Sequence, residues 1–166
     1  MKKLLLLDAD IIMDLHTLDL FEKVRNVYDI YITKTVLDEA KYFKKDGERF
    51  EINLTNEVNI IEDINIENLN RVHENAKDAM LQMDLGEATS IAYLIETDED
   101  IKFCTCDKAA ITLVSFMNLD EKCISLENAF LEVGQNRTLY PRHWDSYLKE
   151  SVSKGKELRL YNLVLT

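Results

Sequence analysis

The chain has 166 residues, of which 46% are hydrophobic and 31% are charged, a balance that supports a packed core and excludes a disordered chain. One proline and four glycines exclude collagen-like and low-complexity sequences. The formal net charge of −11 excludes a protein that coats nucleic acid through an overall positive charge.

Strands and helices are predicted to alternate along most of the chain. The first strand is the apolar run Leu4–Leu7, which is continuously hydrophobic and therefore typical of a strand buried on both faces. Further strands are expected at residues 28–33, 58–61, 101–106 and 122–125. Helices are expected at residues 11–24, 34–43, 66–83, 88–95, 109–117 and from 126 to about 133, whereas residues 44–55 fit no element clearly. This alternation predicts an α/β fold with a central, mostly parallel five-stranded sheet flanked by helices in three layers.

The last thirty residues differ in charge from the rest. Residues 137–166 hold six Lys/Arg and three Asp/Glu, so the acidic excess lies entirely in residues 1–136. We expect a main domain over residues 1–136 and a C-terminal extension over residues 137–166, packed on or near it. A short helix around Trp144 and a final strand over residues 158–165 are expected within the extension.

The three cysteines indicate a reducing environment. Cys104, Cys106 and Cys123 are too few for a disulfide framework, and their number is odd. They are also one ligand short of a thiolate zinc site, so buried free thiols are the simpler interpretation. The run Leu4–Leu7 is too short for a signal-peptide core or a membrane span. We therefore expect a cytoplasmic protein with no membrane association.

Carboxylates gather where the predicted strands end. Asp8 ends the first strand and Asp10 follows it, whereas Asp107 ends the strand at residues 101–106. Glu87 opens a helix, and Glu39 lies in the helix after the second strand. Each residue alone is explained by helix capping, by the helix dipole or by a solvated helix face. Together they predict an acidic site, because the carboxyl ends of parallel strands meet at one edge of a sheet.

Four segments resemble the motifs of PIN domains, a family of metal-dependent ribonucleases. Leu4–Ile12 (LLLLDADII) resembles the family's opening, and Val36–Ala40 (VLDEA) its second acidic motif. Leu85–Ala92 (LGEATSIA) is similar to a variant of the third motif, and Thr105–Ala109 (TCDKA) to the fourth. Their order and spacing agree over about residues 4–135. Asp10 departs from the family pattern, which often has Ser, Thr or Asn there.

The resemblance implies a catalytic tetrad of Asp8, Glu39, Glu87 and Asp107. Clustered carboxylates raise one another's pKa unless cations are present, and oxygen ligands without His or Cys select Mg²⁺ or Mn²⁺. We expect Asp8, Asp10, Glu87 and Asp107 as the metal-binding set, with Glu39 holding a second ion or orienting the attacking water. The reaction is then phosphodiester hydrolysis. The family also suggests single-stranded RNA as substrate, a cognate antitoxin as partner and a homodimer.

Basic residues near the acidic motifs are candidates for phosphate contacts. Lys41, Lys44, Lys45 and Arg49 follow Glu39 and are predicted to form one wall of a substrate site. A second wall is expected from the extension, through Arg137, Arg142, Lys149, Lys154, Lys156 and Arg159. A solvated charged face is the simpler explanation of either cluster.

Two other functions fit parts of the sequence. Asp8 and Asp10 also resemble the first motif of haloacid-dehalogenase-type phosphatases, in which Asp8 would be the nucleophile and Asp10 the general acid. The later acidic pair of that family is poorly matched by residues 98–100, which precede a predicted strand instead of following one. The second alternative is a non-catalytic, acidic protein-interaction module that binds Mg²⁺ weakly.

Overall fold

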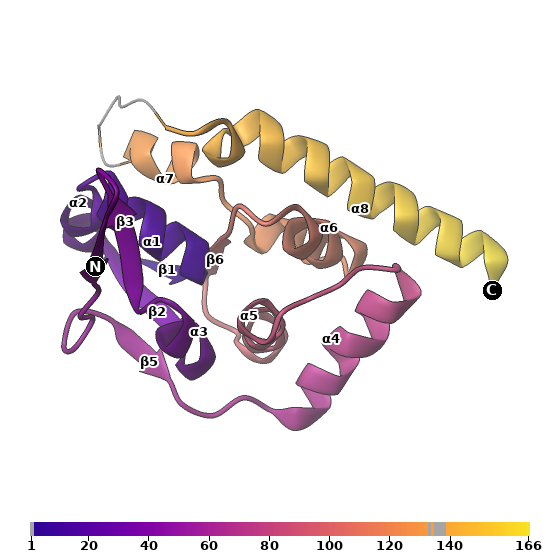
Figure 1. Cartoon of the computed structure of the whole chain (residues 1–166). Coiled ribbons are helices and arrows are strands. Elements are labelled where there is room, and N and C mark those ends of the chain that lie inside the picture. Colours follow the sequence, from indigo (N-terminus) through magenta and orange to yellow (C-terminus); the bar gives the residue numbers. More distant parts are fainter. Residues whose placement is uncertain (1, 133, 135–138) are drawn as a thin grey trace.

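The central feature of the fold is a four-stranded parallel sheet. The structure is a computed structural model that describes residues 2–132, 134 and 139–166 (Figure 1). The strand order is β5-β2-β1-β6, and all three neighbouring pairs run parallel. The strands are β1 (Lys3–Leu7), β2 (Tyr28–Thr33), β5 (Asn59–Ile61) and β6 (Ile101–Cys104). The predicted α/β architecture with a parallel sheet is confirmed.

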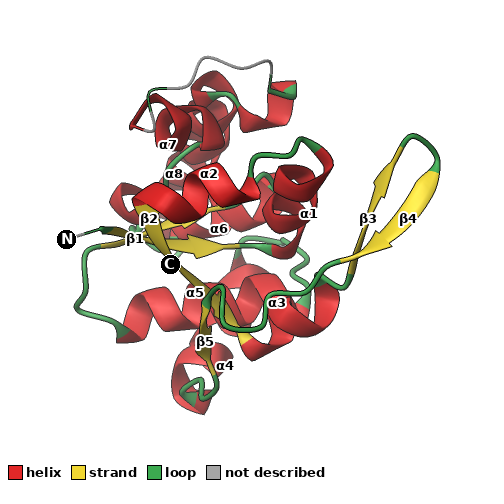
Figure 2. Cartoon of the chain, turned by 90° about the vertical axis from the view of Figure 1, so that its left-hand side faces the viewer, coloured by secondary structure: helices red, strands yellow, loops and turns green. Residues whose placement is uncertain are grey.

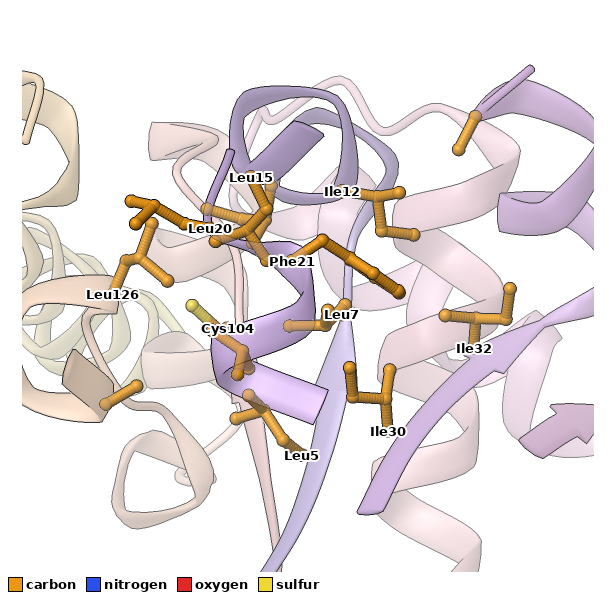
Figure 3. Close-up of a cluster of buried hydrophobic side chains, with 14 of the residues drawn as sticks. Leu5, Leu7, Ile12, Leu15, Leu20, Phe21, Ile30, Ile32, Cys104 and Leu126 are labelled. Atoms are coloured by element: carbon orange, nitrogen blue, oxygen red, sulfur yellow. The ribbon is translucent and has the colours of Figure 1, made fainter. Parts of the chain in front are cut away.

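Helices cover both faces of this sheet and give it two separate cores. Leu5 and Leu7 of β1 belong to one hydrophobic cluster, whereas Leu4 and Leu6 belong to the other, because successive strand residues point to opposite faces. Figure 3 shows the first cluster around Leu5 and Leu7. Its helices are α1 (Ala9–Thr17), α2 (Phe21–Val27), α3 (Lys34–Glu39) and α7 (Leu126–Glu132). The second face is covered by α4 (Ile66–Asp78), α5 (Leu85–Glu96) and α6 (Lys108–Phe116).

The fifth strand expected at residues 122–125 does not form, which corrects that prediction. Residues Asp120–Lys122 make a 3₁₀ turn, and Cys123 makes only an isolated parallel bridge to Phe103. The backbone N–H of Ile124 still donates to the Phe103 carbonyl oxygen at 3.0 Å. The chain therefore contacts the edge of β6 at Cys123 and Ile124 before α7 begins at Leu126.

The strand expected at residues 158–165 is instead the end of a 21-residue helix, α8 (Asp145–Leu165), which follows a 3₁₀ turn at Pro141–His143. Helix α8 packs along α6, as Figure 1 shows. Gly155 faces α6 so closely that a Cβ there would lie 2.6 Å from the Ser115 Cβ. A helix satisfies its own backbone hydrogen bonds, and in the described part of the chain no strand pairs with residues 158–165. The apolar side chains at the end of α8 are exposed.

Residues 40–52 form a β-hairpin, where the sequence predicted a helix as far as Phe43. The helix ends at Glu39, and β3 (Tyr42–Lys45) pairs antiparallel with β4 (Glu48–Glu51). Asp46 and Gly47 both have positive φ, at 52° and 82°, as a two-residue hairpin turn requires. The hairpin projects beside α1 (Figure 2). Phe43 stacks on His16 of α1 with ring centroids 5.6 Å apart, which holds the hairpin against the body.

In the described part of the chain, no helix combines the length and the apolar character needed to cross a membrane.

Candidate active site

Strands β1 and β6 lie side by side, with Leu7 opposite Cys104. After β1 the chain enters α1 on one face of the sheet, and after β6 it enters α6 on the other. The gap between these two strands is therefore a topological switch point, the place where open parallel sheets form binding crevices. Asp8 and Asp107 stand at this gap as the N-caps of α1 and α6.

Asp8 is buried and held at both carboxylate oxygens. Its side chain is 4% exposed, and Oδ1 accepts from the Ala9 backbone N–H at 2.8 Å. Oδ2 accepts from the Thr105 hydroxyl at 2.9 Å. The same hydroxyl oxygen accepts from the Asp107 backbone N–H at 3.1 Å. Burial raises the pKa of Asp8 to about 7 in spite of these bonds.

Glu87 occupies the first turn of α5, next to its N-cap Asp84. The two form a capping box, in which the Glu87 N–H donates to Asp84 Oδ1 at 2.8 Å and the Asp84 N–H donates to Glu87 Oε2 at 3.1 Å. Glu87 is 7% exposed. Burial and the nearby Asp107 raise the pKa of Glu87 to about 8. The capping box thus explains why α5 begins at this point. It leaves the Glu87 carboxylate close to those of Asp107, Asp84 and Asp8.

Glu39 reaches the same edge from the end of α3. Its Oε1 accepts from the Gly86 backbone N–H at 3.2 Å. A Cβ at position 86 would overlap the Glu39 carboxylate, so glycine is required there for this contact. Burial and the charge of Asp84 raise the pKa of Glu39. The structure therefore brings the second acidic motif to the start of α5.

Asp10 completes an acidic group of six side chains. Burial raises the pKa of Asp10, Arg142 opposes this rise, and Asp14, Asp107 and Asp84 add to it. Burial and neighbouring carboxylates raise the pKa of four members of the group, Asp8, Asp10, Glu39 and Glu87. All six offer oxygen donors only, which is the ligand chemistry that a hard divalent cation such as Mg²⁺ or Mn²⁺ prefers. We name this group the acidic edge; its members are Asp8, Asp10, Glu39, Asp84, Glu87 and Asp107.

A cleft of about 700 Å³ opens beside the acidic edge. Asp10 and Glu39 are members of the acidic edge that also line the cleft. One wall is the hairpin, and the other is the segment before α8. The lining residues are Asp10, Met13, Asp14, Thr17, Glu39, Tyr42, Phe43, Lys44, Arg49, Tyr140 and Arg142.

The segment before α8 is fastened to α1 through Asp14. The Arg142 Nη2 atom lies 2.7 Å from each Asp14 carboxylate oxygen, and Arg142 Nε donates to Oδ2 at 3.2 Å. His143 Nε2 donates to Oδ2 at 2.7 Å. Burial raises the pKa of Asp14, but these partners outweigh it and hold the pKa below its ordinary value. We name these three residues the Asp14 anchor.

Cys106 lies against this anchor. Among the residues that the structure describes, Asp14, Cys106 and His143 are the one trio of potential metal ligands whose atoms all lie within 4.8 Å of each other. However, both Asp14 oxygens are already bound by Arg142 and His143, and burial raises the pKa of the Cys106 thiol to about 12. This trio therefore serves as a packed support behind the cleft, and the thiol is not a nucleophile.

The basic residues predicted to contact phosphate take different places. Lys44 and Arg49 line the cleft, Lys45 pairs with Asp19, and Lys41 is exposed outside the cleft lining. Of the second set, Arg142 lines the cleft and Arg137 lies outside the described residues. The rest pair along or near α8: Lys149 with Asp145, Lys154 with Glu157, Lys156 with Asp120, and Arg159 with Asn118.

Several site residues were missed from the sequence. Asp84 carries a visible signal, because an N-cap aspartate three residues before a glutamate is a capping-box pattern. Asp14, Tyr140 and His143 carry none, since Asp14 and His143 are 129 positions apart along the chain.

Comparisons with known protein families, with characterised proteins and with solved structures find no significant match to this chain.

Proposed function

We propose that this protein is a Mg²⁺- or Mn²⁺-dependent nuclease that hydrolyses phosphodiester bonds of single-stranded RNA, as the resemblance to PIN domains suggests. The observation that supports it is the position of the acidic edge. Carboxylates from four chain segments interact electrostatically around the switch point of the sheet, and Asp8 and Glu87 among them are buried. Asp10 and Glu39 open into a cleft that three cationic side chains also line, Lys44, Arg49 and Arg142.

Asp8, Asp10, Glu87 and Asp107 are the residues that would hold the metal. Bound there, the ion would supply a nucleophilic hydroxide from water and stabilise the charge that develops on the phosphate and the leaving oxygen. The raised pKa values of Asp8 and Glu87 favour this assignment, because a divalent cation stabilises the ionised form that burial and neighbouring carboxylates disfavour.

Other groups of the chain position the ligands and the substrate. The Thr105 hydroxyl and the Ala9 N–H fix both oxygens of Asp8. The Gly86 N–H holds Glu39 at the cleft, where its carboxylate can orient a water molecule. Lys44 and Arg142 place positive charge opposite the acidic edge, so that a phosphate can approach it.

The proposed biological role is that of a toxin controlled by a cognate antitoxin. An antitoxin would inhibit the enzyme by covering the cleft, and we expect the toxin itself to be a homodimer. Co-purification from the native operon without a second chain would contradict the antitoxin, and a monomeric mass by light scattering would contradict the dimer.

The decisive experiment is cleavage of mixed single-stranded RNA and DNA with Mn²⁺, Mg²⁺ or EDTA. Asp8→Asn and Asp107→Asn are compared with the wild type and with Asp63→Asn, an exposed aspartate outside the acidic edge. We expect metal-dependent RNA cleavage that both site variants lose and the control keeps. Hydrolysis of a generic phosphate ester without RNA cleavage would instead favour the phosphatase, and metal binding without any hydrolysis would favour the interaction module.

A further inference from the structure

Two arginine–tyrosine pairs face the cleft from its two walls. On the hairpin, the Arg49 guanidinium carbon lies 3.7 Å from the centre of the Tyr42 ring. Before α8, the Arg142 guanidinium carbon lies 5.4 Å from the centre of the Tyr140 ring. All four residues line the cleft. We name them the tyrosine clamp.

We propose that the tyrosine clamp binds an unpaired nucleic-acid strand, with bases stacked on both pairs and phosphates held by Arg142 and Lys44. This inference deepens the proposed nuclease function and rests on it for the choice of ligand. Aromatic rings and guanidinium planes are the surfaces on which proteins stack unpaired bases, whatever the base sequence.

The exposure of the tyrosines favours a ligand over a packing role. Tyr42 is 42% exposed and Tyr140 is 39% exposed, although apolar contacts are close by. Phe43, in contrast, is half-buried and stacks on His16 and Phe50. The hairpin therefore uses Phe43 for its own attachment and leaves Tyr42, on the opposite side of the strand, free to present its ring.

Both walls of the clamp are held in place before any ligand arrives. The hairpin is tied to α1 by the Phe43–His16 stack. The opposite wall is tied by the Asp14 anchor. Because the anchor uses Nε and Nη2 of Arg142, the Nη1 group keeps its two hydrogens for a phosphate oxygen. Such preorganisation lowers the entropy lost on binding.

Charge explains why the clamp needs both stacking and cations. The chain carries a net charge of −11, and Asp10 and Glu39 open directly into the cleft. Phosphates alone would be repelled, so the uncharged faces of the bases must supply part of the affinity. In a duplex these faces are covered by neighbouring base pairs, and the clamp therefore selects single strands.

The test measures binding separately from cleavage. A short fluorescent oligouridine is titrated with Asp8→Asn protein in Mg²⁺, and anisotropy is followed; the same RNA paired with its complement is the duplex probe. Tyr42→Ala and Tyr140→Ala are added to this background. Tyr161→Ala, which removes an exposed tyrosine of α8 outside the cleft, is the matched control, and Tyr140→Phe keeps the ring without the hydroxyl.

Each alanine variant at the clamp is expected to weaken single-strand binding by about five-fold or more, the loss of one base–aromatic stack. Tyr161→Ala and Tyr140→Phe are expected to bind like the background, and the duplex more weakly than the single strand. Equal binding of duplex and single strand, or unchanged affinity in both alanine variants, would overturn the clamp. Clamp-dependent binding without metal-dependent cleavage by the wild type would support the clamp and contradict the nuclease. Metal-dependent cleavage at an unchanged rate after replacement of either tyrosine would support the nuclease and contradict the clamp.

Discussion

Thr105 donates its hydroxyl hydrogen to Asp8 at 2.9 Å across the switch point between β6 and β1. Its oxygen also accepts from the Asp107 backbone N–H. One hydroxyl thereby joins the two aspartates that end neighbouring strands. It favours the ionised form of Asp8 against the burial that raises its pKa, so Thr105 prepares this carboxylate for a cation.

Replacing Thr105 by valine tests whether its hydrogen bond to Asp8 supports metal binding. Valine keeps the branched shape but removes the donor, so the pKa of Asp8 should rise further and Mn²⁺ affinity should fall about 10-fold or more, as is typical when a partner of a metal ligand is lost. Isothermal titration with Mn²⁺ at neutral pH measures the change. Thr55→Val, at an exposed threonine of the loop after β4, is the control, and equal affinity in the two variants would contradict the assigned role of Thr105.

The metal-free protein should lose stability as pH rises. The pKa of Asp8 lies at about 7 in the folded state against 3.8 for an unburied side chain, so between these values the folded state holds a proton that the unfolded state has lost. The free energy of unfolding therefore falls from about pH 4 to about pH 7, by on the order of 4 kcal/mol from Asp8 alone. Glu87, with its pKa raised to about 8, extends the fall to higher pH.

Urea denaturation in EDTA at several pH values measures this dependence. Asp8→Asn should flatten the curve because it removes the titrating group, whereas Asp63→Asn should leave its slope unchanged. Mg²⁺ or Mn²⁺ should restore stability most strongly at the alkaline end. If the Asp8→Asn curve fell between pH 4 and pH 7 as steeply as that of the wild type, Asp8 would not be the buried, proton-binding group described above.

The Asp14 anchor can be followed through the single tryptophan. Trp144 directly follows His143, so release of this segment should change its environment. Asp14→Asn weakens the bonds to Arg142 and His143, and we expect a loss of about 1–3 kcal/mol in the free energy of unfolding, the cost of leaving a buried polar group without its partner. A shift in Trp144 fluorescence at unchanged far-UV circular dichroism would accompany it. Glu22→Gln, which breaks an exposed pair with Arg25, should change neither observable.

Gly155 should tolerate no side chain. In an open helix, replacing glycine by alanine stabilises the fold by about 1 kcal/mol. Here the added Cβ would crowd the Thr112 carbonyl oxygen and the Ser115 Cβ of α6, so we expect Gly155→Ala to destabilise by about 1–3 kcal/mol through overpacking. Thermal or urea unfolding decides the sign. Ser153→Ala, at an exposed position of the same helix, should stay within about 0.5 kcal/mol of the wild type.

Much of the layered fold was predictable because its signals are local. The apolar run Leu4–Leu7 is typical of a strand buried on both faces, and the structure divides its residues between two cores. Asp8 and Asp107 follow strands that the structure places next to each other, a neighbourhood that the sequence left open. Asp46-Gly47 is likewise a local turn pattern, although the hairpin around it was not predicted.

The sequence by itself therefore determined the alternation of elements and the carboxylates at the ends of strands, since periodicity and capping depend on residues a few positions apart. Only the tertiary structure decided which distant groups share a site. Asp14 meets Arg142 and His143 across more than a hundred residues, and Tyr42 and Tyr140 face one cleft from opposite walls. It also decided that residues 158–165 continue helix α8, which packs on α6 at Gly155, and none of the described strands pairs with them. Long-range packing chooses among conformations that local preference leaves nearly equal in free energy.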